Sequence, residues 1–439
     1  MKHFKITPGE GLKGEIDVPG DKSISHRAII LSSLAEGRSE ISGLLEGEDC
    51  LSTISVFNNM GVDISTENGN YFVEGNGLKG LEKPISSLDF GNSGTSIRLC
   101  SGILSAQDFG STLIGDDSLS TRPMDRIVEP LSFMGADISG TKEGTLPINI
   151  EPVDSLIGIK YSLPVASAQV KSCIMFASLY AEGVSEIEET VTTRDHTETM
   201  FKQFNIPVEV SRQKKANLIK VGKVDVVKPR NINICGDFSS ASFFILAALI
   251  SPNSHLIIRN VGINKTRIGF LHALRHMGAD IELQNKIDSF EPTADISVKS
   301  SNLKGISLNT NLVANMIDEM PAFFIAASLA EGITKVKDAK ELRTKESDRL
   351  QVMSEVLEAF GVKYHLNEDG IIIHGLGKEG VFRAAEINSH GDHRIAMAGS
   401  IASLRADGES RINDCNNVST SFPNFLDTCT KVGIKIEES

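Results

Sequence analysis

The chain has 439 residues, enough for about three average domains, and its composition (40% hydrophobic, 23% charged) excludes a disordered, collagen-like or coiled-coil protein. Its net charge of −13 argues against a surface for nucleic acid or anionic membrane. The longest apolar runs, such as residues 243–250, are too short to span a membrane, and residues 1–20 hold no stretch of the signal-peptide type, so we expect a cytoplasmic protein.

The six cysteines are scattered along the chain and form no CxxC pair. We therefore expect them to be reduced and mostly buried. Trp is absent and aromatic residues make up 5% of the chain, which disfavours a stacking surface for single-stranded nucleic acid.

The predicted elements begin with two short strands, at residues 2–7 and 12–18, that belong to no repeat of their own. A helix follows, with apolar residues at helical spacing and a stop at Gly37. A strand, a second helix and a hairpin complete the first unit, whose five elements are expected at residues 23–35, 39–45, 48–60, 62–65 and 71–74.

This order of elements recurs along the whole chain. A helix end followed by Gly or Asn and a short alternating strand appears six times, at intervals of about 70 to 83 residues, at Gly61, Gly135, Asn205, Gly278, Gly361 and Gly433. The fifth copy repeats the first closely, with elements expected at residues 316–329, 334–337, 347–360, 362–366 and 370–374. The sequence therefore predicts six copies of one α/β unit.

The sixth copy stops at Ile436 and lacks its final strand. The simplest closure lets the N-terminal strands complete it, which predicts two domains of three units each. One domain would be discontinuous, residues 1–19 plus 236–439, and the other would be continuous, residues 20–235. A linear solenoid open at both ends is the alternative, but it leaves the missing strand unexplained.

Polar and basic residues gather at the predicted helix starts. These starts are at residues 20–23, 91–95, 167–169, 236–240 and 391–394 for first helices, and 120–123, 193–196 and 343–347 for second helices. Free N–H groups and the positive end of the helix dipole make such turns binding sites for phosphate and carboxylate. Asp21, Asp237 and Asp392 can be read as ordinary caps.

Capping does not require cations, yet eight lie in or near these turns: Lys22, Arg27, Arg98, Arg122, Arg194, Lys345, Arg349 and Arg394. In an acidic chain, this distribution indicates a small polyanionic substrate. Each of these residues could instead be a solvated surface charge.

The groups suited to acid–base chemistry are Asp318, Glu346, His393 and Lys22. Asp318 precedes an apolar helix, and a partly desolvated carboxylate there suits a general base. Glu346 lies between two cations, Lys345 and Arg349, so a simple salt bridge is the alternative for this residue.

Seven motifs in the chain are similar to those of the EPSP synthase (3-phosphoshikimate 1-carboxyvinyltransferase) family, and their details resemble its class II branch. They cover the chain in the expected order, at residues 19–27, 44–49, 91–95, 122–124, 194–198, 345–349 and 392–397. The resemblance implies a two-domain inside-out α/β barrel with three βαβαββ units per domain. It also implies transfer of the enolpyruvyl group of phosphoenolpyruvate to the 5-hydroxyl of shikimate 3-phosphate, without a metal or organic cofactor.

The resemblance also implies roles for individual residues. The residues expected to hold shikimate 3-phosphate are Lys22, Ser23, Arg27, Ser167, Ala168, Gln169, Arg194, Asp318 and Lys345. Those expected to hold phosphoenolpyruvate are Lys22, Gly94, Arg122, Gln169, Arg349 and Arg394. Asp318 is the expected general base, Glu346 and Lys22 are expected to move protons at the methylene carbon, and His393 completes the catalytic set.

Two positions depart from other family members. Thr420 stands where the class I branch has Lys, which removes any Lys contact expected from that loop. Glyphosate-tolerant class II members carry Ala where this chain has Gly94, so we expect room for glyphosate as an inhibitor. No interface segment stands out in the sequence, and we expect a monomer.

Two rival functions remain open at this point. The UDP-N-acetylglucosamine enolpyruvyl transferases share the architecture and carry a reactive Cys or Asp before an Arg that binds phosphoenolpyruvate. Residues 110–122 contain no Cys, although Asp116 and Asp117 leave an ambiguity. A non-catalytic anion-binding repeat protein would need the cations but neither Asp318 nor Glu346.

Overall fold

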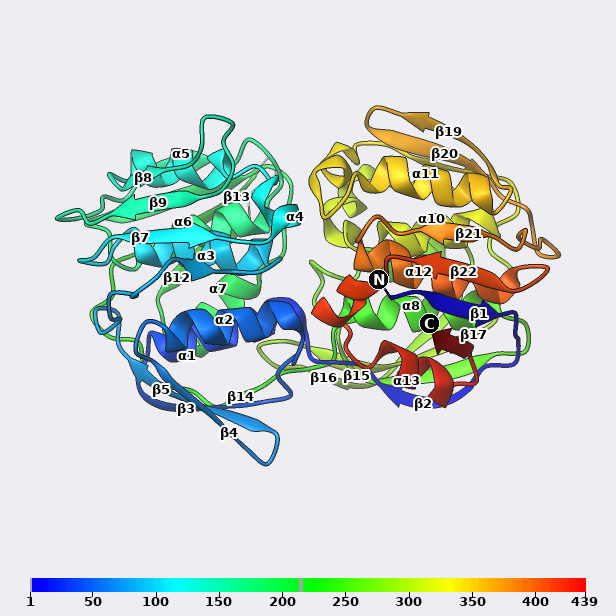
Figure 1. The fold of residues 1–439 in the computed structure, drawn as a ribbon, viewed down its shortest axis with the longest axis horizontal. Coiled ribbons are helices and arrows are strands. Elements are labelled where there is room, and N and C mark those ends of the chain that lie inside the picture. Colours follow the sequence, from blue (N-terminus) through cyan, green and yellow to red (C-terminus); the bar gives the residue numbers. More distant parts are fainter. Residues whose placement is uncertain (1, 213–215) are drawn as a thin grey trace. The chain divides into compact units, whose positions relative to one another are not determined.

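The computed structural model describes residues 2–212 and 216–439, and the chain divides into two compact units (Figure 1). The continuous unit is Gly20–Ile234, and the discontinuous unit combines Met1–Pro19 with Cys235–Ser439. Cys235 thus belongs to the discontinuous unit, one residue away from the expected crossing.

The continuous unit contains three four-stranded sheets. The first has the order β14 (Ile232–Asn233), β3 (Glu36–Ser42), β5 (Asn70–Asn76) and β4 (Asp63–Glu67); the second has β6 (Leu88–Asp89), β7 (Ser111–Ile114), β9 (Ile148–Glu151) and β8 (Asp137–Ser139); the third has β10 (Lys160–Ser162), β11 (Val184–Glu189), β13 (Asn217–Gly222) and β12 (Val208–Arg212). In each sheet the first strand pairs in parallel and the others are antiparallel. Because β14 comes from the end of the unit and pairs with β3 at its start, the three repeats close into a ring.

The discontinuous unit repeats this plan with two four-stranded sheets and one three-stranded sheet. Their orders are β16 (Asp280–Ile287), β17 (Thr293–Lys299), β15 (His255–Gly262), β2 (Lys13–Asp17); then β18 (Ile333–Val336), β20 (Gly370–His374), β19 (Lys363–Asn367); then β21 (Glu386–Asn388), β22 (Ser410–Asn413), β1 (Phe4–Thr7), β23 (Lys435–Glu438). The six predicted repeats are therefore present, and the hairpins expected in the first and fifth repeats form within a few residues of their predicted bounds.

The N-terminal segment completes the last sheet, as the missing strand of the sixth repeat predicted. β1 lies between β22 and β23 and is antiparallel to both, with Phe4 opposite Ile412 and Glu438. β2 does not join this sheet. It pairs in parallel with β15 of the fourth repeat, with Ile16 opposite Ile258, so the chain start serves two sheets.

In each unit the sheets cover a central group of helices (Figure 1). The innermost helices are the first of each repeat: α1 (Lys22–Ser33), α3 (Gly94–Leu104) and α6 (Ala168–Ser178) in the continuous unit, and α8 (Phe238–Ile250), α10 (Met320–Ser328) and α12 (His393–Ala402) in the discontinuous unit. All thirteen residues of α8 are buried, because other helices cover one side and a sheet covers the other. Such a helix needs apolar or small residues on every face, which explains why its sequence shows no helical stripe.

The second helices of the repeats lie nearer the surface and are amphipathic. They are α2 (Glu48–Asn58), α5 (Asp125–Phe133), α7 (His196–Gln203), α9 (Gly269–His276), α11 (Arg349–Ala359) and α13 (Phe425–Lys431). In the discontinuous unit, the rings of Phe422 and Phe425 pack on Phe244 of α8 at centroid distances of 5.8 and 6.2 Å. Aromatic packing of this kind adds to the burial energy of the core.

One predicted helix is wrong in its first turn. The helix expected at residues 316–329 is interrupted: a 3-10 turn, η2 (Ala314–Met316), precedes α10, and Asp318 lies in the turn between them. Pro321 explains the interruption, because its ring fits the first turn of a helix but not its interior. Asp318 is therefore carried by a turn and not by a helix.

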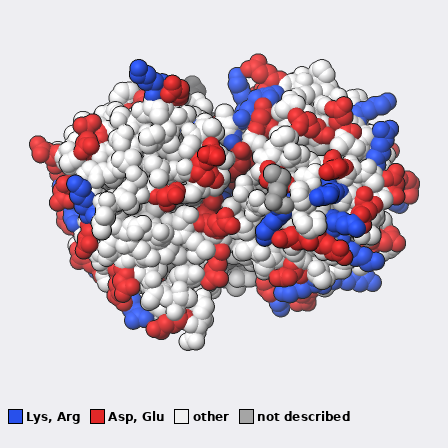
Figure 2. All heavy atoms as spheres, viewed as in Figure 1, with Lys and Arg blue, Asp and Glu red and all other residues white. Residues whose placement is uncertain are grey.

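The surface and the cysteines agree with the composition. On the face seen in Figure 2, basic side chains stand among acidic ones and form no broad patch. The six cysteines are free and buried, as predicted. Among the described residues, no helix has the length and apolar character needed to cross a membrane.

Candidate active site

The inner helices start at capping residues, and the interpretation of Asp21, Asp237 and Asp392 as ordinary helix caps is confirmed. Asp21 Oδ1 accepts a hydrogen bond from Ile24 N at 2.9 Å, Asp237 caps α8 in a similar way at 2.6 Å, and Asp392 accepts from Arg394 N at 2.9 Å. Ser93 and Ser167 cap α3 and α6. The caps fix where each helix begins, and therefore which side chains stand at its positive end.

In the continuous unit, α1 carries two of the expected cations. Lys22 forms an ion pair with the buried carboxylate of Asp49 at the start of α2. Arg27 is almost fully buried, and its guanidinium donates to Thr197 Oγ1 at 2.7 Å and to Ser172 Oγ at 2.8 Å. Arg27 thus joins α1 to both α6 and α7, and its charge is held in one position.

Gln169, in the first turn of α6, is oriented by Arg98. Arg98 Nη1 donates to Gln169 Oε1 at 2.6 Å, and Gln169 Nε2 donates to Thr95 Oγ1 at 2.9 Å. Arg98 Nη2 also donates to the carbonyl of Pro123 at 3.1 Å. Sequence analysis had grouped Arg98 only with the anion-binding cations, so its supporting contacts were missed.

Arg122 lies at the start of α3, which carries Gly94 and Thr95. Its guanidinium donates to Asn92 Oδ1 at 2.6 Å, to the Asn92 carbonyl at 3.3 Å and to Ser118 Oγ at 3.1 Å. A Cβ atom added to Gly94 would lie 2.9 Å from Arg98 Nη1 and 3.3 Å from Arg122 Nη1. The structure therefore brings together Gly94, Arg122 and Gln169, three of the six residues expected to hold phosphoenolpyruvate.

The continuous unit also holds a buried ion-pair cluster that sequence analysis missed. Lys171 on α6 is completely buried, and its Nζ lies 2.7 Å from Glu198 Oε1 and 3.0 Å from Glu189 Oε2. Burial alone lowers the pKa of Lys171, but the two carboxylates outweigh it and the pKa is raised. Burial raises the pKa of Glu198, although Lys171 opposes this.

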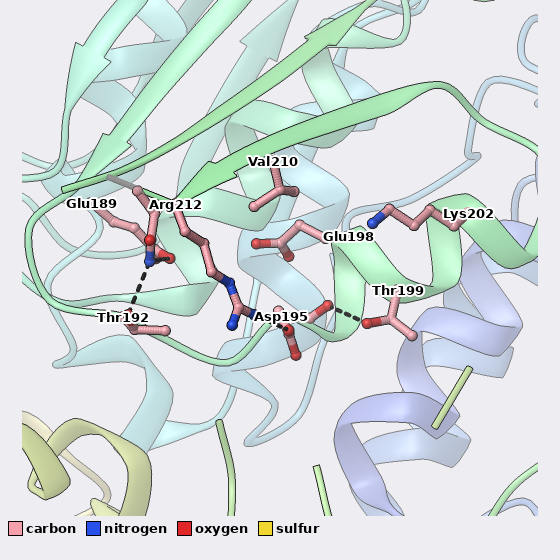
Figure 3. Close-up of a pocket in the computed structure, with 9 residues that line it drawn as sticks. Glu189, Thr192, Asp195, Glu198, Thr199, Lys202, Val210 and Arg212 are labelled. Carbon is pink, nitrogen blue, oxygen red and sulfur yellow. Dashed lines mark hydrogen bonds and ion pairs between the residues drawn. The ribbon is translucent and has the colours of Figure 1, made fainter. Parts of the chain in front are cut away.

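A cavity of about 290 Å³ lies beside this cluster (Figure 3). It is lined by the side chains of Glu189, Asp195, Glu198, Lys202 and Arg212, among others. None of its described lining residues belongs to the set expected at either substrate. Arg194, which does belong to that set, lies half-buried on the loop before α7.

In the discontinuous unit, the expected site residues gather around Arg349. This side chain is completely buried, and its guanidinium donates to Asp392 at 2.8 Å, to Asp318 at 3.2 Å and to Glu346 at 2.6 Å. Burial lowers the pKa of Arg349, but Asp392, Glu346 and Asp318 together raise it above its usual value. Arg349 is thus a permanent cation whose orientation is fixed by three acids.

Asp318 lies between two guanidinium groups. Its Oδ1 accepts from Arg349, and its Oδ2 lies 3.7 Å from Arg394 Nη2. The side chain is 18% exposed, so it is partly desolvated, as expected, but its surroundings are more cationic than the sequence indicated.

Glu346 and Lys345 lie just before α11. Glu346 forms a salt bridge with Arg349 and is 21% exposed. Lys345 lies 3.4 Å from Glu341, and burial lowers the pKa of its ammonium although Glu341 and Asp318 oppose this. His393 is buried at the start of α12.

Comparisons with known proteins agree over the full chain. The family model of EPSP synthase (3-phosphoshikimate 1-carboxyvinyltransferase) matches residues 6–429. A 3-phosphoshikimate 1-carboxyvinyltransferase of Hydrogenovibrio crunogenus is 49% identical, over 99% of this chain and 98% of that protein. One of Legionella pneumophila is 47% identical over 100% of both chains.

Solved structures give the same result. An EPSP synthase from Acinetobacter baumannii superposes with a TM-score of 0.87 at 46% identity, covering 100% of each chain. The enolpyruvyl transferase NikO from Streptomyces tendae, at 13% identity, shares the fold with a TM-score of 0.80 over 100% of this chain and 99% of its own. The expected inside-out α/β fold is therefore confirmed, and the chain belongs to the EPSP synthase family.

Proposed function

We propose that this protein transfers the enolpyruvyl group of phosphoenolpyruvate to the 5-hydroxyl of shikimate 3-phosphate, giving 5-enolpyruvylshikimate 3-phosphate and phosphate. This reaction belongs to the shikimate pathway, which leads to chorismate and the aromatic amino acids. The observation that carries the proposal is near-50% identity over the whole chain to proteins named for this reaction. The cation-rich helix ends of both units support it, because both substrates are small polyanions.

Shikimate 3-phosphate is proposed to bind at the starts of α1 and α6. Two of its ligands, Ser167 and Ala168, offer a helix N-terminus, and Lys22 and Arg194 add positive charge. Ser23 and Gln169 complete this group. Arg27 supplies a charge that cannot swing away, because its guanidinium is already hydrogen-bonded to neighbouring helices.

Phosphoenolpyruvate is proposed to bind near Gly94, where Arg122 and Gln169 converge, with Lys22 also in contact. Arg349 and Arg394 are its proposed ligands from the discontinuous unit. The close approach of Arg98 and Arg122 to Gly94 supports this assignment, since a side chain there would occupy space beside the guanidinium groups. Fixed cations of this kind stabilise charge that develops on phosphate and carboxylate during transfer.

The chemistry is proposed to begin at Asp318, which with Lys345 binds the reacting 5-hydroxyl. Asp318 accepts the hydroxyl proton while the oxygen forms a bond to C2 of phosphoenolpyruvate. A proton supplied by Glu346 or Lys22 converts the methylene carbon into a methyl group, giving a tetrahedral intermediate. The bond from C2 to the phosphate oxygen then breaks, phosphate leaves with the bonding electrons and takes up the hydroxyl proton, and a methyl proton returns to the residue that supplied it, which forms the enol ether of the product.

His393 is proposed to assist near the phosphate of phosphoenolpyruvate, where its burial at the start of α12 would hold it beside Arg394. Lys345 is suited to contact a hydroxyl that loses its proton, because burial lowers the pKa of its ammonium. Neither role requires a metal or an organic cofactor.

A phosphate-release assay with both substrates together, and with each alone, tests the proposal. We expect phosphate only when both are present. In a parallel assay with phosphoenolpyruvate, UDP-N-acetylglucosamine replaces shikimate 3-phosphate. Phosphate release with the sugar nucleotide as acceptor, and none with shikimate 3-phosphate, would overturn the assignment. Asp116 favours the first acceptor, because both its oxygens are engaged, with Leu119 N at 2.7 Å and with Asn92 Nδ2 at 2.7 Å, in a capping role.

We also propose a monomeric enzyme that works in the cytoplasm and is inhibited by glyphosate. Six free, buried thiols are consistent with a reducing compartment. Gel filtration with light scattering measures the oligomeric state, and a dimer mass would overturn that part of the proposal.

A further inference from the structure

One buried ammonium group, that of Lys171, is bonded to both flanks of the loop that carries Arg194. Glu189 ends β11, and Glu198 lies in the first turn of α7, so residues 190–195 run between the two carboxylates. Lys171 Nζ contacts both, at 3.0 and 2.7 Å. Figure 3 shows Glu189 near the start and Glu198 near the end of the segment that carries Thr192 and Asp195.

The upstream flank is fastened through Thr193, the residue before Arg194. Its backbone N–H and its hydroxyl donate to Glu189 Oε2, at 3.3 and 2.8 Å, and this is the oxygen that Lys171 contacts. Glu189 Oε1 accepts from Asn217 Nδ2 at 3.2 Å. The residue that precedes Arg194 is therefore attached to a carboxylate oxygen that Lys171 also contacts.

The downstream flank is fastened through α7. Glu198 binds Lys171 directly, and the neighbouring Thr197 hydroxyl lies 2.6 Å from Ser172 Oγ, so two adjacent side-chain contacts join α7 to α6. Arg27 also donates to Thr197. A shift of α7 would consequently disturb two proposed ligands of shikimate 3-phosphate at once.

We propose that Lys171 is a positioning residue for shikimate 3-phosphate, acting on Arg194 through Glu189 and Thr193. The inference rests on the proposed function, in which Arg194 binds this substrate. Lys171 is 0% exposed, so it acts through its neighbours and does not itself touch a ligand. A buried pair that served stability alone would need no bonds from Glu189 to the loop.

The experiment compares the wild-type protein with Lys171→Met, Thr193→Val and the double variant. The KM for each substrate is measured, together with the Kd for shikimate 3-phosphate alone by titration calorimetry. Each single change is expected to raise the KM and Kd for shikimate 3-phosphate by about tenfold, since small misplacements of binding groups are costly, with less effect on phosphoenolpyruvate. The double variant is expected to have no higher KM and Kd for shikimate 3-phosphate than the single variant with the larger effect. The reason is that both changes break the same chain of contacts.

Ser178→Ala is the matched control. Ser178 is also buried on α6, where its hydroxyl donates to the Ile174 carbonyl at 2.6 Å and lies 2.7 Å from Ser185 Oγ on β11. Its loss loosens the same helix–strand contact without reaching Thr193, so the melting temperature should fall while both KM values stay unchanged.

Thr193→Val keeps the inference open to refutation even if Lys171→Met fails to fold. A wild-type KM in Thr193→Val would overturn it, and so would single effects that multiply in the double variant. Wild-type protein that neither binds nor turns over shikimate 3-phosphate would refute the proposed function itself, and the inference with it. Wild-type turnover with unaffected variants would refute the inference alone.

Discussion

Each unit contains a completely buried cation held by carboxylates, yet the two clusters differ in access. In the continuous unit, Lys171 is paired with Glu189 and Glu198, whose side chains are 4% and 5% exposed. In the discontinuous unit, Arg349 is paired with buried Asp392 and with Asp318 and Glu346, which are 18% and 21% exposed. We call the first cluster sealed because its carboxylates are almost fully buried, although they border the cavity of Figure 3, and we call the second cluster open.

The difference separates a supporting role from a chemical one. A sealed cluster can fix the position of neighbouring backbone, but its carboxylates expose little surface on which a substrate could bind. An open cluster keeps its acids oriented by a fixed guanidinium and still exposes them to a ligand. Ionisable residues with this combination of burial and access are typical of catalytic sites.

The largest expected effect is a loss of kcat when a carboxylate of the open cluster is replaced. Asp318→Asn keeps the shape of the side chain but removes the proposed base, so kcat should fall by about 10³-fold. Phosphate release under saturating substrates measures this. The change should leave the fold intact, because Asp318 remains partly exposed and an amide can still accept from Arg349.

Glu368→Gln serves as its control in the same unit. Glu368 pairs with Lys340 at the surface and is 79% exposed, so its loss should leave kcat and stability close to wild type. If Asp318→Asn turned over as fast as this control, Asp318 would not be the base.

The next largest effect is a loss of stability when the cation of the sealed cluster is replaced. Lys171→Met leaves Glu189 and Glu198 buried without their cation, and should lower the free energy of unfolding by about 3–5 kcal/mol. Urea denaturation followed by circular dichroism measures the loss. A variant as stable as wild type would show that water or another group replaces the ammonium, and that the cluster is not sealed.

Much of this architecture could be predicted from local signals. Gly61 and its five counterparts, at regular spacing after helices, indicated six repeats, and the missing strand after Ile436 indicated that the N-terminus returns to the last sheet. The pairing of β2 with β15 was missed, because strand partners depend on contacts remote in sequence. The turn at Asp318 was missed because the apolar pattern outweighed Pro321 in the prediction.

The site shows the same limit. Arg122, Gly94 and Gln169 stood out because helix starts are recognisable locally, but Lys171 did not. Its counter-ions lie 18 and 27 residues along the chain, so nothing near it in the sequence explains a buried ammonium. The one available signal was a Lys inside an otherwise apolar and small-residue helix, where Lys is rarely buried unless it is paired.

A smaller effect is expected from a substitution at Gly94, at the start of α3 in the continuous unit. Gly94→Ala would place a methyl group 2.9 Å from Arg98 Nη1 and 3.3 Å from Arg122 Nη1, so these flexible groups must shift. We expect wild-type protein to be inhibited by millimolar glyphosate, and Gly94→Ala to raise the half-inhibitory concentration by about tenfold or more, with a higher KM for phosphoenolpyruvate. Inhibition assays at fixed shikimate 3-phosphate measure both, and a wild-type protein insensitive to the inhibitor would contradict the expectation.

The smallest effect is a pH dependence of the sealed cluster. Burial raises the pKa of Glu198 above its ordinary value of 4.5, so the folded protein binds a proton there that the unfolded chain releases first. Between 4.5 and the raised pKa, the contribution of Glu198 to stability must therefore fall as pH rises.

Glu198→Gln removes this titration while its amide oxygen can still accept from Lys171. We expect the variant to gain stability relative to wild type as pH increases above 4.5, measured by urea denaturation at a series of pH values. Among the described residues, the Asn217 side chain donates to Glu189 and to the Thr192 hydroxyl, so Asn217→Ala should shift stability equally at every pH. A difference between Glu198→Gln and wild type that stayed constant with pH would show that Glu198 is fully ionised by its ammonium partner and that the cluster carries its net negative charge at all these pH values.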